Sequence, residues 1–203
     1  GDRANRELIN IFEALGSGRA RSGSPPPPNT HPNEHVQMIR PDDAAPQRNH
    51  KVALCVTPAN MLLDINLIDS ALGEKGKWTY SFLRMIDSGA PVMFSSHCPV
   101  CEPDPLEGIH AAVTRQRLDG TPSDGWHPAN RVTVAEALAA YTSTPAAVHR
   151  AGDLGTIAPG KRADLLLLEH NPLDDVANAR KIIGVMSAGR WYDEKAILEM
   201  LEI

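Results

Sequence analysis

The sequence predicts an α/β fold in which a parallel sheet, covered on both faces, is followed by a small antiparallel β unit. Two runs of apolar and β-branched residues, KVALCVTP (51–58) and APVMFSS (90–96), show little polar alternation, and helical patterns follow them. Such runs are typical of parallel strands buried between helices. Near residue 150 the composition changes to apolar runs separated by Pro-Gly and Gly turns. We therefore expect one domain over residues 1–150 and a second over residues 151–203.

The amino-terminal segment predicts an amphipathic helix and then a loop. In RANRELINIFEAL (3–15) the apolar side chains recur at helical spacing. We expect this helix to end at Gly16, because residues 16–33 are rich in Gly, Ser and Pro and include the run Pro25 to Pro28. That composition favours an exposed loop with polyproline II backbone. The next run, EHVQMI (34–39), is interpreted as a strand or the end of one.

The remaining elements follow the same alternation. Helices are expected over residues 70–89, 104–118 and 133–149. The last of them opens with Thr133 and, three positions later, Glu136, which is the pattern of a capping box. In the second domain, ADLLLL (163–168) and IIGVMSA (182–188) are expected to be strands packed on one another, with a short helix at the end of the chain.

Composition and charge argue against several classes of function. The chain has 203 residues, of which 42% are hydrophobic, enough for a globular core. A net charge of −5 without a basic stripe argues against nucleic-acid binding. No apolar run approaches the roughly 20 residues that cross a bilayer, so we expect no membrane partner. Three cysteines and the lack of a signal peptide favour the cytoplasm. The chain starts at Gly1 without a methionine, and we expect that a preceding segment is missing.

Polar residues lie at the ends of three predicted strands, the first pair at the start of the run at 34–39, and strand ends are where parallel α/β folds place their sites. They are Glu34 with His35, the segment 57–60, and the segment 96–101. A neutral imidazole at a strand end suits Zn²⁺, so His35 and His97 are candidate ligands, with hydrogen-bonded structural histidines as the alternative. The six other histidines are expected to be solvated or to serve packing.

Cys98 and Cys101 have the Cys-x-x-Cys spacing of half a structural zinc site or of a redox pair. No second Cys/His pair stands at a suitable spacing, and no thioredoxin-like context surrounds the motif. A strand-end loop that holds two thiols is the simpler interpretation, and the alternatives stay open. The sequence also lacks a Gly-x-Ser-x-Gly elbow and a phosphate loop, so neither a serine hydrolase nor nucleotide binding is indicated.

Six segments in this order and spacing resemble one family. They are GDRAN (1–5), EHVQ (34–37), SSHCPV (95–100), PLEGIHAAVTR (105–115), TVAEALAAYTSTPA (133–146) and GTIAPGKRADLLLL (155–168). They resemble the metal-dependent amidohydrolase superfamily, in its branch related to N-acyl-amino-acid and exoenzyme-regulatory-type proteins. The resemblance implies the later strands and helices of a (β/α)₈ TIM-type barrel, followed by part of a carboxyl-terminal β-sandwich.

The resemblance also implies a ligand set. The family pattern has an HxH pair on the first barrel strand, a lysine on the fourth, histidines on the fifth and sixth, and an aspartate on the eighth. Gly1 then follows the position of the fifth-strand histidine, so the earlier ligands are absent from this chain. His35 matches the sixth-strand histidine, and His97 stands at the position of the eighth-strand aspartate. Asn60 stands where the family often has a histidine.

The function implied by the resemblance is metal-dependent hydrolysis of an amide or cyclic amide, a carbon–nitrogen bond outside peptides. A divalent metal, expected to be zinc, would be bound by His35 and His97, with His97 in the catalytic position. Because the upstream ligands are absent, we expect the isolated chain to be inactive. A half barrel has unpaired strand edges, so we expect a homo-oligomer or a complementing chain, with a small-molecule amide as substrate. The alternatives are a non-enzymatic half-barrel scaffold and a Cys-x-x-Cys zinc module.

Overall fold

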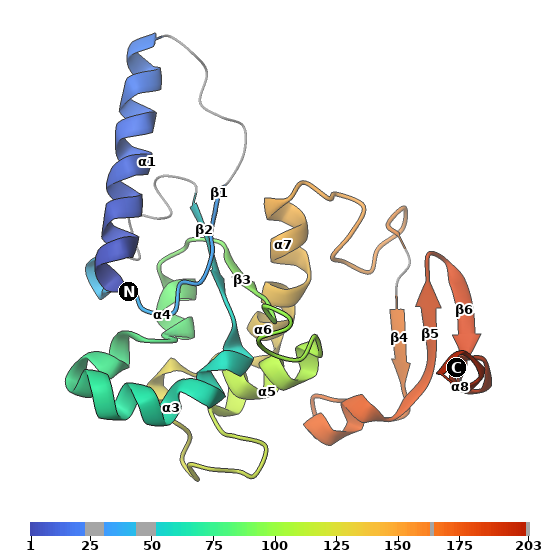
Figure 1. Ribbon diagram of the computed structural model, residues 1–203. Helices are drawn as coiled ribbons and strands as arrows, with labels where there is room; N and C mark the ends of the chain where they lie inside the picture. Colours follow the sequence, from blue (N-terminus) through green and yellow to red (C-terminus); the bar gives the residue numbers. More distant parts are fainter. Residues whose placement is uncertain (23–30, 44–51, 163–164, 202–203) are drawn as a thin grey trace. The chain divides into compact units, whose positions relative to one another are not determined.

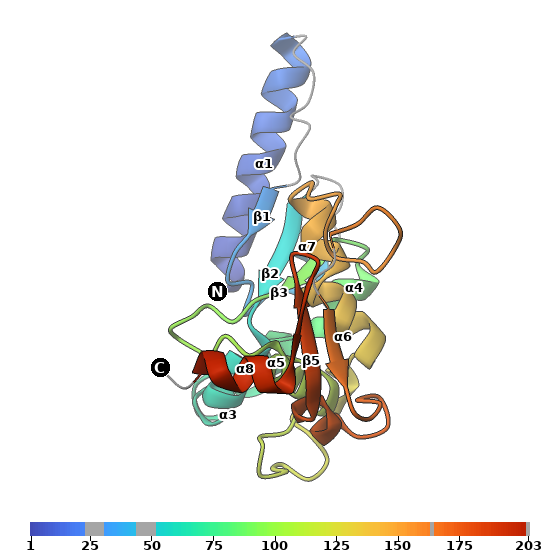
Figure 2. The same cartoon turned by 90° about the vertical axis from the view of Figure 1, so that its right-hand side faces the viewer.

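Three parallel strands form the sheet at the centre of the first part of the chain. The computed structural model describes residues 1–22, 31–43, 52–162 and 165–201. The strands β1 (His31–Asn33), β2 (Val52–Val56) and β3 (Val92–Phe94) pair in the order β1-β2-β3, both pairs being parallel. Figures 1 and 2 both show them side by side. The predicted parallel α/β architecture is confirmed.

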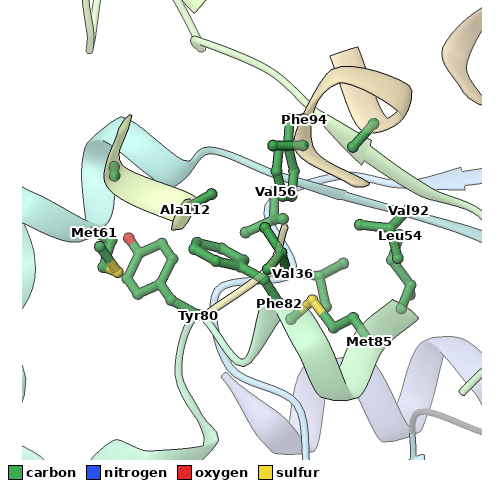
Figure 3. Packing of buried hydrophobic residues seen from close by; sticks show 14 of the residues in the cluster. Val36, Leu54, Val56, Met61, Tyr80, Phe82, Met85, Val92, Phe94 and Ala112 are labelled. Atoms are coloured by element: carbon green, nitrogen blue, oxygen red, sulfur yellow. The ribbon is translucent and has the colours of Figure 1, made fainter. Parts of the chain in front are cut away.

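The sheet is buried on both faces, as the apolar runs predict. Leu54 and Val56 of β2, with Val92 and Phe94 of β3, pack in a large cluster with residues from the helices, which Figure 3 shows. Alternate residues on the same strands, Ala53, Cys55 and Met93, form a second cluster with Val148. Because side chains alternate along a strand, the two clusters lie on opposite faces.

Helices connect and cover the strands. They are α1 (Asp2–Ser22), α3 (Pro58–Leu72), the 3₁₀ helix η1 (Gly73–Trp78), α4 (Phe82–Asp87), α5 (Pro105–Thr114), the 3₁₀ helix η2 (Pro128–Asn130), α6 (Val134–Tyr141) and α7 (Ser143–Val148). In Figure 1 the strands lie between α1 on one side and α6 and α7 on the other. The described part of the chain contains no helix that is long and apolar enough to cross a membrane.

Two segments that were each predicted to be a single helix are divided into several elements. The expected helix over residues 70–89 is three elements, because α3 ends at Gly73, where φ is 49°, and Tyr80 has φ 46° between η1 and α4. The expected helix over residues 133–149 divides into α6 and α7. Thr142, with φ −127° and ψ −80°, separates them, and Pro145 in the first turn of α7 has no N–H for the carbonyl of Tyr141. The capping box of Thr133 and Glu136 is present.

The amino-terminal boundaries also differ from the prediction. The helix does not end at Gly16 as expected, because α1 continues to Ser22. Gly16 and Gly18 each cost a helix about 1 kcal/mol, but Arg19, Ala20 and Arg21 are good helix formers. The predicted polyproline segment at Pro25 to Pro28 lies outside the described residues. The strand expected at 34–39 lies earlier, at β1, because His35 has φ 58° and cannot extend it.

The chain divides into two compact units, residues 1–151 and residues 152–203. The second unit contains the strands β4 (Leu165–Leu168), β5 (Ile182–Ser187) and β6 (Arg190–Asp193), the 3₁₀ helix η3 (Val176–Arg180) and the helix α8 (Glu194–Leu201). β4 and β5 are antiparallel, as are β5 and β6. The predicted pairing of two strands in this region is confirmed for the described residues. That this sheet is a segment of a β-sandwich stays a prediction.

Candidate functional site

The polar residues nominated by the sequence gather at the carboxyl edge of the first unit's sheet. Glu34 and His35 follow β1, Asn60 lies in the first turn of α3 after β2, and Ser95 and His97 follow β3. In a parallel sheet these strand ends meet at one edge, which is where α/β folds place their sites. The arrangement is therefore that of a site built from consecutive strand ends.

His35 and His97 lie against one another. They come from the two outer strands of the sheet, yet their ring centroids are 4.0 Å apart, with an angle of 63° between the planes. Both side chains are exposed. Both backbones are left-handed, with φ of 58° and 51°. That conformation costs a non-glycine residue on the order of 1 kcal/mol, and residues strained in this way cluster at active sites and ligand clamps. The two candidate metal ligands are thus brought together.

The imidazole pair fits part of a metal centre. A hydrolytic zinc centre normally has three protein ligands and an open position for water. Within the described ranges, no group of three or more His, Cys, Asp or Glu side chains could hold a metal ion. The residues that the structure describes therefore do not complete such a centre.

Cys55 is a member of this edge that the sequence reading did not nominate. It lies on β2, is buried, and hydrogen-bonds with Glu34 and Ser95. Burial first, and the hydrogen bond to Glu34 second, raise the pKa of its thiol to about 12. The thiol is therefore protonated at neutral pH and is a poor nucleophile and metal ligand. The hydroxyl of Ser95 also lies 3.1 Å from that of Thr57.

A second polar cluster surrounds the hydroxyl of Tyr80. This hydroxyl donates to Asp64 Oδ2 at 2.5 Å and accepts from the amide nitrogens of Asn60 at 2.8 Å and Gln37 at 3.0 Å. Burial and the hydrogen bond to Asp64 raise the pKa of Tyr80 above its usual range. Of these residues, the sequence reading nominated only Asn60. The available signal for Gln37 was a polar residue within the otherwise apolar run VQMI at 36–39.

The two cysteines of the Cys-x-x-Cys motif are in different environments. Cys98 is exposed and Cys101 is buried, and both are free thiols. Burial raises the pKa of Cys101, whose Sγ lies 3.9 Å from Oδ1 of Asn60. No metal-binding group that includes either thiol exists among the described residues.

A small hollow of about 10 Å³, room for about one water molecule, lies elsewhere on the first unit. It is lined by Ile39, Arg40, Pro41, Trp78, Ser81, Arg84 and Met85. None of these is a strand-end residue of the imidazole edge, so the hollow is separate from the candidate site.

Residues 1–191 match the sequence model of the amidohydrolase family. The chain belongs to the amidohydrolase family. This match covers both units and confirms the family, while the specific branch expected from the sequence stays a prediction. The domain boundaries and the roles of His35 and His97 also remain predictions.

Individual relatives agree with the family. This amidohydrolase chain is 27% identical over 178 residues, 86% of its length, to the protein LONG AFTER FAR-RED 3 of Arabidopsis thaliana. It is 40% identical over 91 residues, 44% of its length, to the N-substituted formamide deformylase of Arthrobacter pascens, of which it covers 16%. A solved structure of an uncharacterized metal-dependent hydrolase from Pyrococcus horikoshii OT3 is 26% identical and covers 89% of the chain with a TM-score of 0.71.

The amidohydrolase chain is much shorter than these relatives. It covers 29% of the Arabidopsis protein and 34% of the Pyrococcus structure, about a third of each. The structural match shows that the three parallel strands and their helices are part of an amidohydrolase barrel. The barrel is covered only in part.

Proposed function

We propose that this chain contributes two metal-binding side chains, His35 and His97, to a hydrolase that cleaves a carbon–nitrogen bond outside peptides. The observation that carries the proposal is the approach of the two rings, 4.0 Å between centroids, at the strand ends of an amidohydrolase sheet. Neutral imidazole is a common ligand of divalent metals, zinc above all.

The substrate class in this proposal is a small amide. It is supported by the similarity to an N-substituted formamide deformylase, which is 40% identical over the 91 matched residues. Amides of this kind, and cyclic amides, offer a carbonyl carbon bonded to nitrogen as the point of attack.

The isolated chain is proposed to be inactive and to bind metal weakly. Two imidazoles fall short of the three protein ligands that a hydrolytic centre takes. Because the chain spans about a third of the length of its relatives, the remaining metal ligands would come from additional polypeptide or from another protein. His97, at the position of the family's aspartate, changes the chemistry as well, because an imidazole is neither anionic nor as strong a ligand for hard cations.

A test of metal binding uses the 203-residue chain with Zn²⁺, followed through the imidazole NMR signals, a method that works for weak binding. His35→Ala and His97→Ala should each strongly weaken Zn²⁺ binding at the remaining imidazole, because one ligand of the pair is lost. His110→Ala is the matched control, since His110 lies on α5 and its ring nitrogen lies beside the Thr114 hydroxyl. Zn²⁺ binding of wild-type affinity in both His35→Ala and His97→Ala would contradict the assignment.

Activity is tested separately on N-substituted formamides, N-acyl amino acids and cyclic amides with added Zn²⁺. We expect no turnover by the chain alone, and none after His97→Asp, because the upstream ligands are still missing. Metal-dependent turnover that is lost in His35→Ala would show instead that this chain builds a complete site. If the chain shows no turnover and no histidine-dependent metal binding, that result would favour the second candidate, a non-enzymatic scaffold. The incomplete ligand set among the described residues is the observation that supports this candidate.

A further inference from the structure

The hydroxyl of Tyr80 joins the segments that follow two neighbouring strands. Tyr80 is wholly buried, and its hydroxyl has partners on the segment after β1 (Gln37) and on α3 after β2 (Asn60 and Asp64). A phenol has one donor and two acceptor positions. All of these are in use, so the hydroxyl fixes the spacing of the two segments.

The backbone of Tyr80 holds the segment that carries His35. Its N–H donates to the carbonyl of Gln37 at 2.8 Å, and the N–H of Gln37 donates to the carbonyl of His35 at 2.7 Å. Between them, the N–H of Val36 donates to the carbonyl of Cys55 at 3.0 Å. A left-handed residue such as His35 keeps its conformation only when the surrounding structure fixes it. The contacts of Gln37 with Tyr80 are a main part of that structure.

Arg115 anchors Tyr80 from the other side. Its guanidinium is fully buried and donates to the carbonyl of Tyr80 at 2.6 Å and to that of Trp126 at 2.8 Å. It also lies over the rings of Phe82, at 4.9 Å, and Trp126, at 5.2 Å. Figure 3 shows the Tyr80 and Phe82 rings beside each other within the core. Arg115 therefore fixes the backbone of Tyr80, while the hydroxyl of Tyr80 contacts the segments that follow β1 and β2.

We infer that Tyr80 is a positioning residue of the imidazole site, which acts through Gln37 to fix His35 against His97. The inference rests on the proposed function, because it assigns Tyr80 a part in metal binding by His35. Tyr80 itself need touch neither metal nor substrate. The substitution Tyr80→Phe keeps the ring in the core and removes the oxygen that bonds Gln37, Asn60 and Asp64.

The first test measures Zn²⁺ affinity in a double-mutant cycle on the whole chain. Loss of a group that orients a metal ligand typically weakens binding about 10- to 100-fold, and we expect Tyr80→Phe to raise the Kd by about tenfold or more. In the His35→Ala background the same substitution should have no further effect, because Tyr80 acts through His35. A purely structural role would instead give the same increase in both backgrounds.

The matched control is Tyr141→Phe. Tyr141 is also a core ring, packed edge-on against Phe94 at 5.5 Å, and its hydroxyl makes no hydrogen bond within the described residues. Removing that hydroxyl should leave the Zn²⁺ affinity unchanged. An equal loss in both variants would show that any change in the core weakens binding.

A second measurement does not depend on metal. Amide hydrogen exchange of the metal-free chain should become at least about tenfold faster at Val36 in Tyr80→Phe, while the Leu54 amide, bonded to the carbonyl of Pro91, keeps its rate. If the wild type shows no zinc binding that needs His35, the proposed function fails, and the Val36 rate still decides whether Tyr80 fixes this segment. Unchanged exchange at Val36, or additive effects in the cycle, overturns the inference.

Discussion

The thiol of Cys55 lies where β2 ends, between Glu34 and Ser95, and the fold changes its acidity. Burial and the hydrogen bond to Glu34 raise its pKa from 9.0 to about 12. Between these values the unfolded thiol loses its proton while the native thiol keeps it. The native state then binds more protons than the unfolded state, so the free energy of unfolding falls as the pH rises through this window. Below pH 9 the contribution of Cys55 is constant.

The corresponding prediction concerns Cys55→Ala. Its free energy of unfolding should fall less steeply between pH 9 and pH 12 than that of the wild type, because the titrating thiol is gone. Urea unfolding at several pH values in this range measures both slopes. Cys98→Ala is the control, since Cys98 is an exposed thiol. Identical slopes for Cys55→Ala and the wild type would contradict the native pKa assigned here.

Single residues also mark the limit of what the sequence predicts about the site. His35 and His97 could be nominated because each lies at an end of a predicted strand, and parallel strand ends converge. Cys55 and Tyr80 could not be nominated. Cys55 lies within an apolar run and Tyr80 within a predicted helix, and such patterns predict the secondary structure of a segment without distinguishing its individual residues. Whether a buried residue faces core or site depends on its partners from distant segments, such as Glu34 for Cys55.

At the scale of elements, the start of α6 is a feature that the sequence predicts in full. The Thr133 hydroxyl accepts from the N–H of Glu136 at 3.2 Å, and the Glu136 carboxylate accepts from the N–H of Thr133 at 2.7 Å. All of this chemistry is local, within four consecutive residues. Element boundaries set by tertiary contacts were not predictable in this way, such as the early end of β1 at Asn33, which depends on pairing with β2.

The capping box gives a prediction for Thr133→Ala. Loss of an N-cap hydroxyl typically costs about 1 kcal/mol, and we expect a decrease of that size in the free energy of unfolding. Thr142→Ala is the matched control, because the Thr142 hydroxyl donates to the carbonyl of Leu138 inside the helix, a contact that adds little stability. Chemical denaturation of both variants provides the comparison. Equal losses would mean that the cap contributes nothing particular.

The contact between α5 and α6 depends on Gly108. A Cβ added there would meet the Tyr141 hydroxyl and would lie 2.9 Å from Cζ of the same ring. Alanine gains roughly 1 kcal/mol in helix propensity over glycine, whereas overpacking a core costs about 1–3 kcal/mol. We expect Gly108→Ala to be destabilising on balance. Adding Tyr141→Phe should recover part of the loss in stability, because it removes the Tyr141 hydroxyl, the atom nearest to the new Cβ. Thermal unfolding of the single and double variants measures both effects. A Gly108→Ala variant more stable than the wild type would refute the prediction.

For the whole molecule, the described surface has two features that favour association. In the first unit, β1 and β3 each pair with β2 and have no second strand partner among the described residues. In the second unit, large apolar side chains are exposed on the three-stranded sheet, among them Leu166, Leu167, Ile182, Ile183 and Trp191. Unpaired edges invite pairing with another chain, and contiguous exposed apolar surface marks interaction sites.

We therefore predict that the chain associates with itself in the absence of a complementing protein. A specific interface buries about 1,000 Å² or more, and we expect the exposed apolar side chains on the sheet of the second unit to take part in it. Sedimentation equilibrium at tens of micromolar should give an average mass above the 22.0 kDa of one chain. Leu166→Lys should lower this mass, because a charge on the apolar sheet has to be desolvated on association. Leu118→Lys, at a leucine of the first unit that is 64% exposed against 46% for Leu166, should leave it unchanged. A wild-type chain that sediments as a monomer at high micromolar concentration would show that these surfaces are tolerated in water.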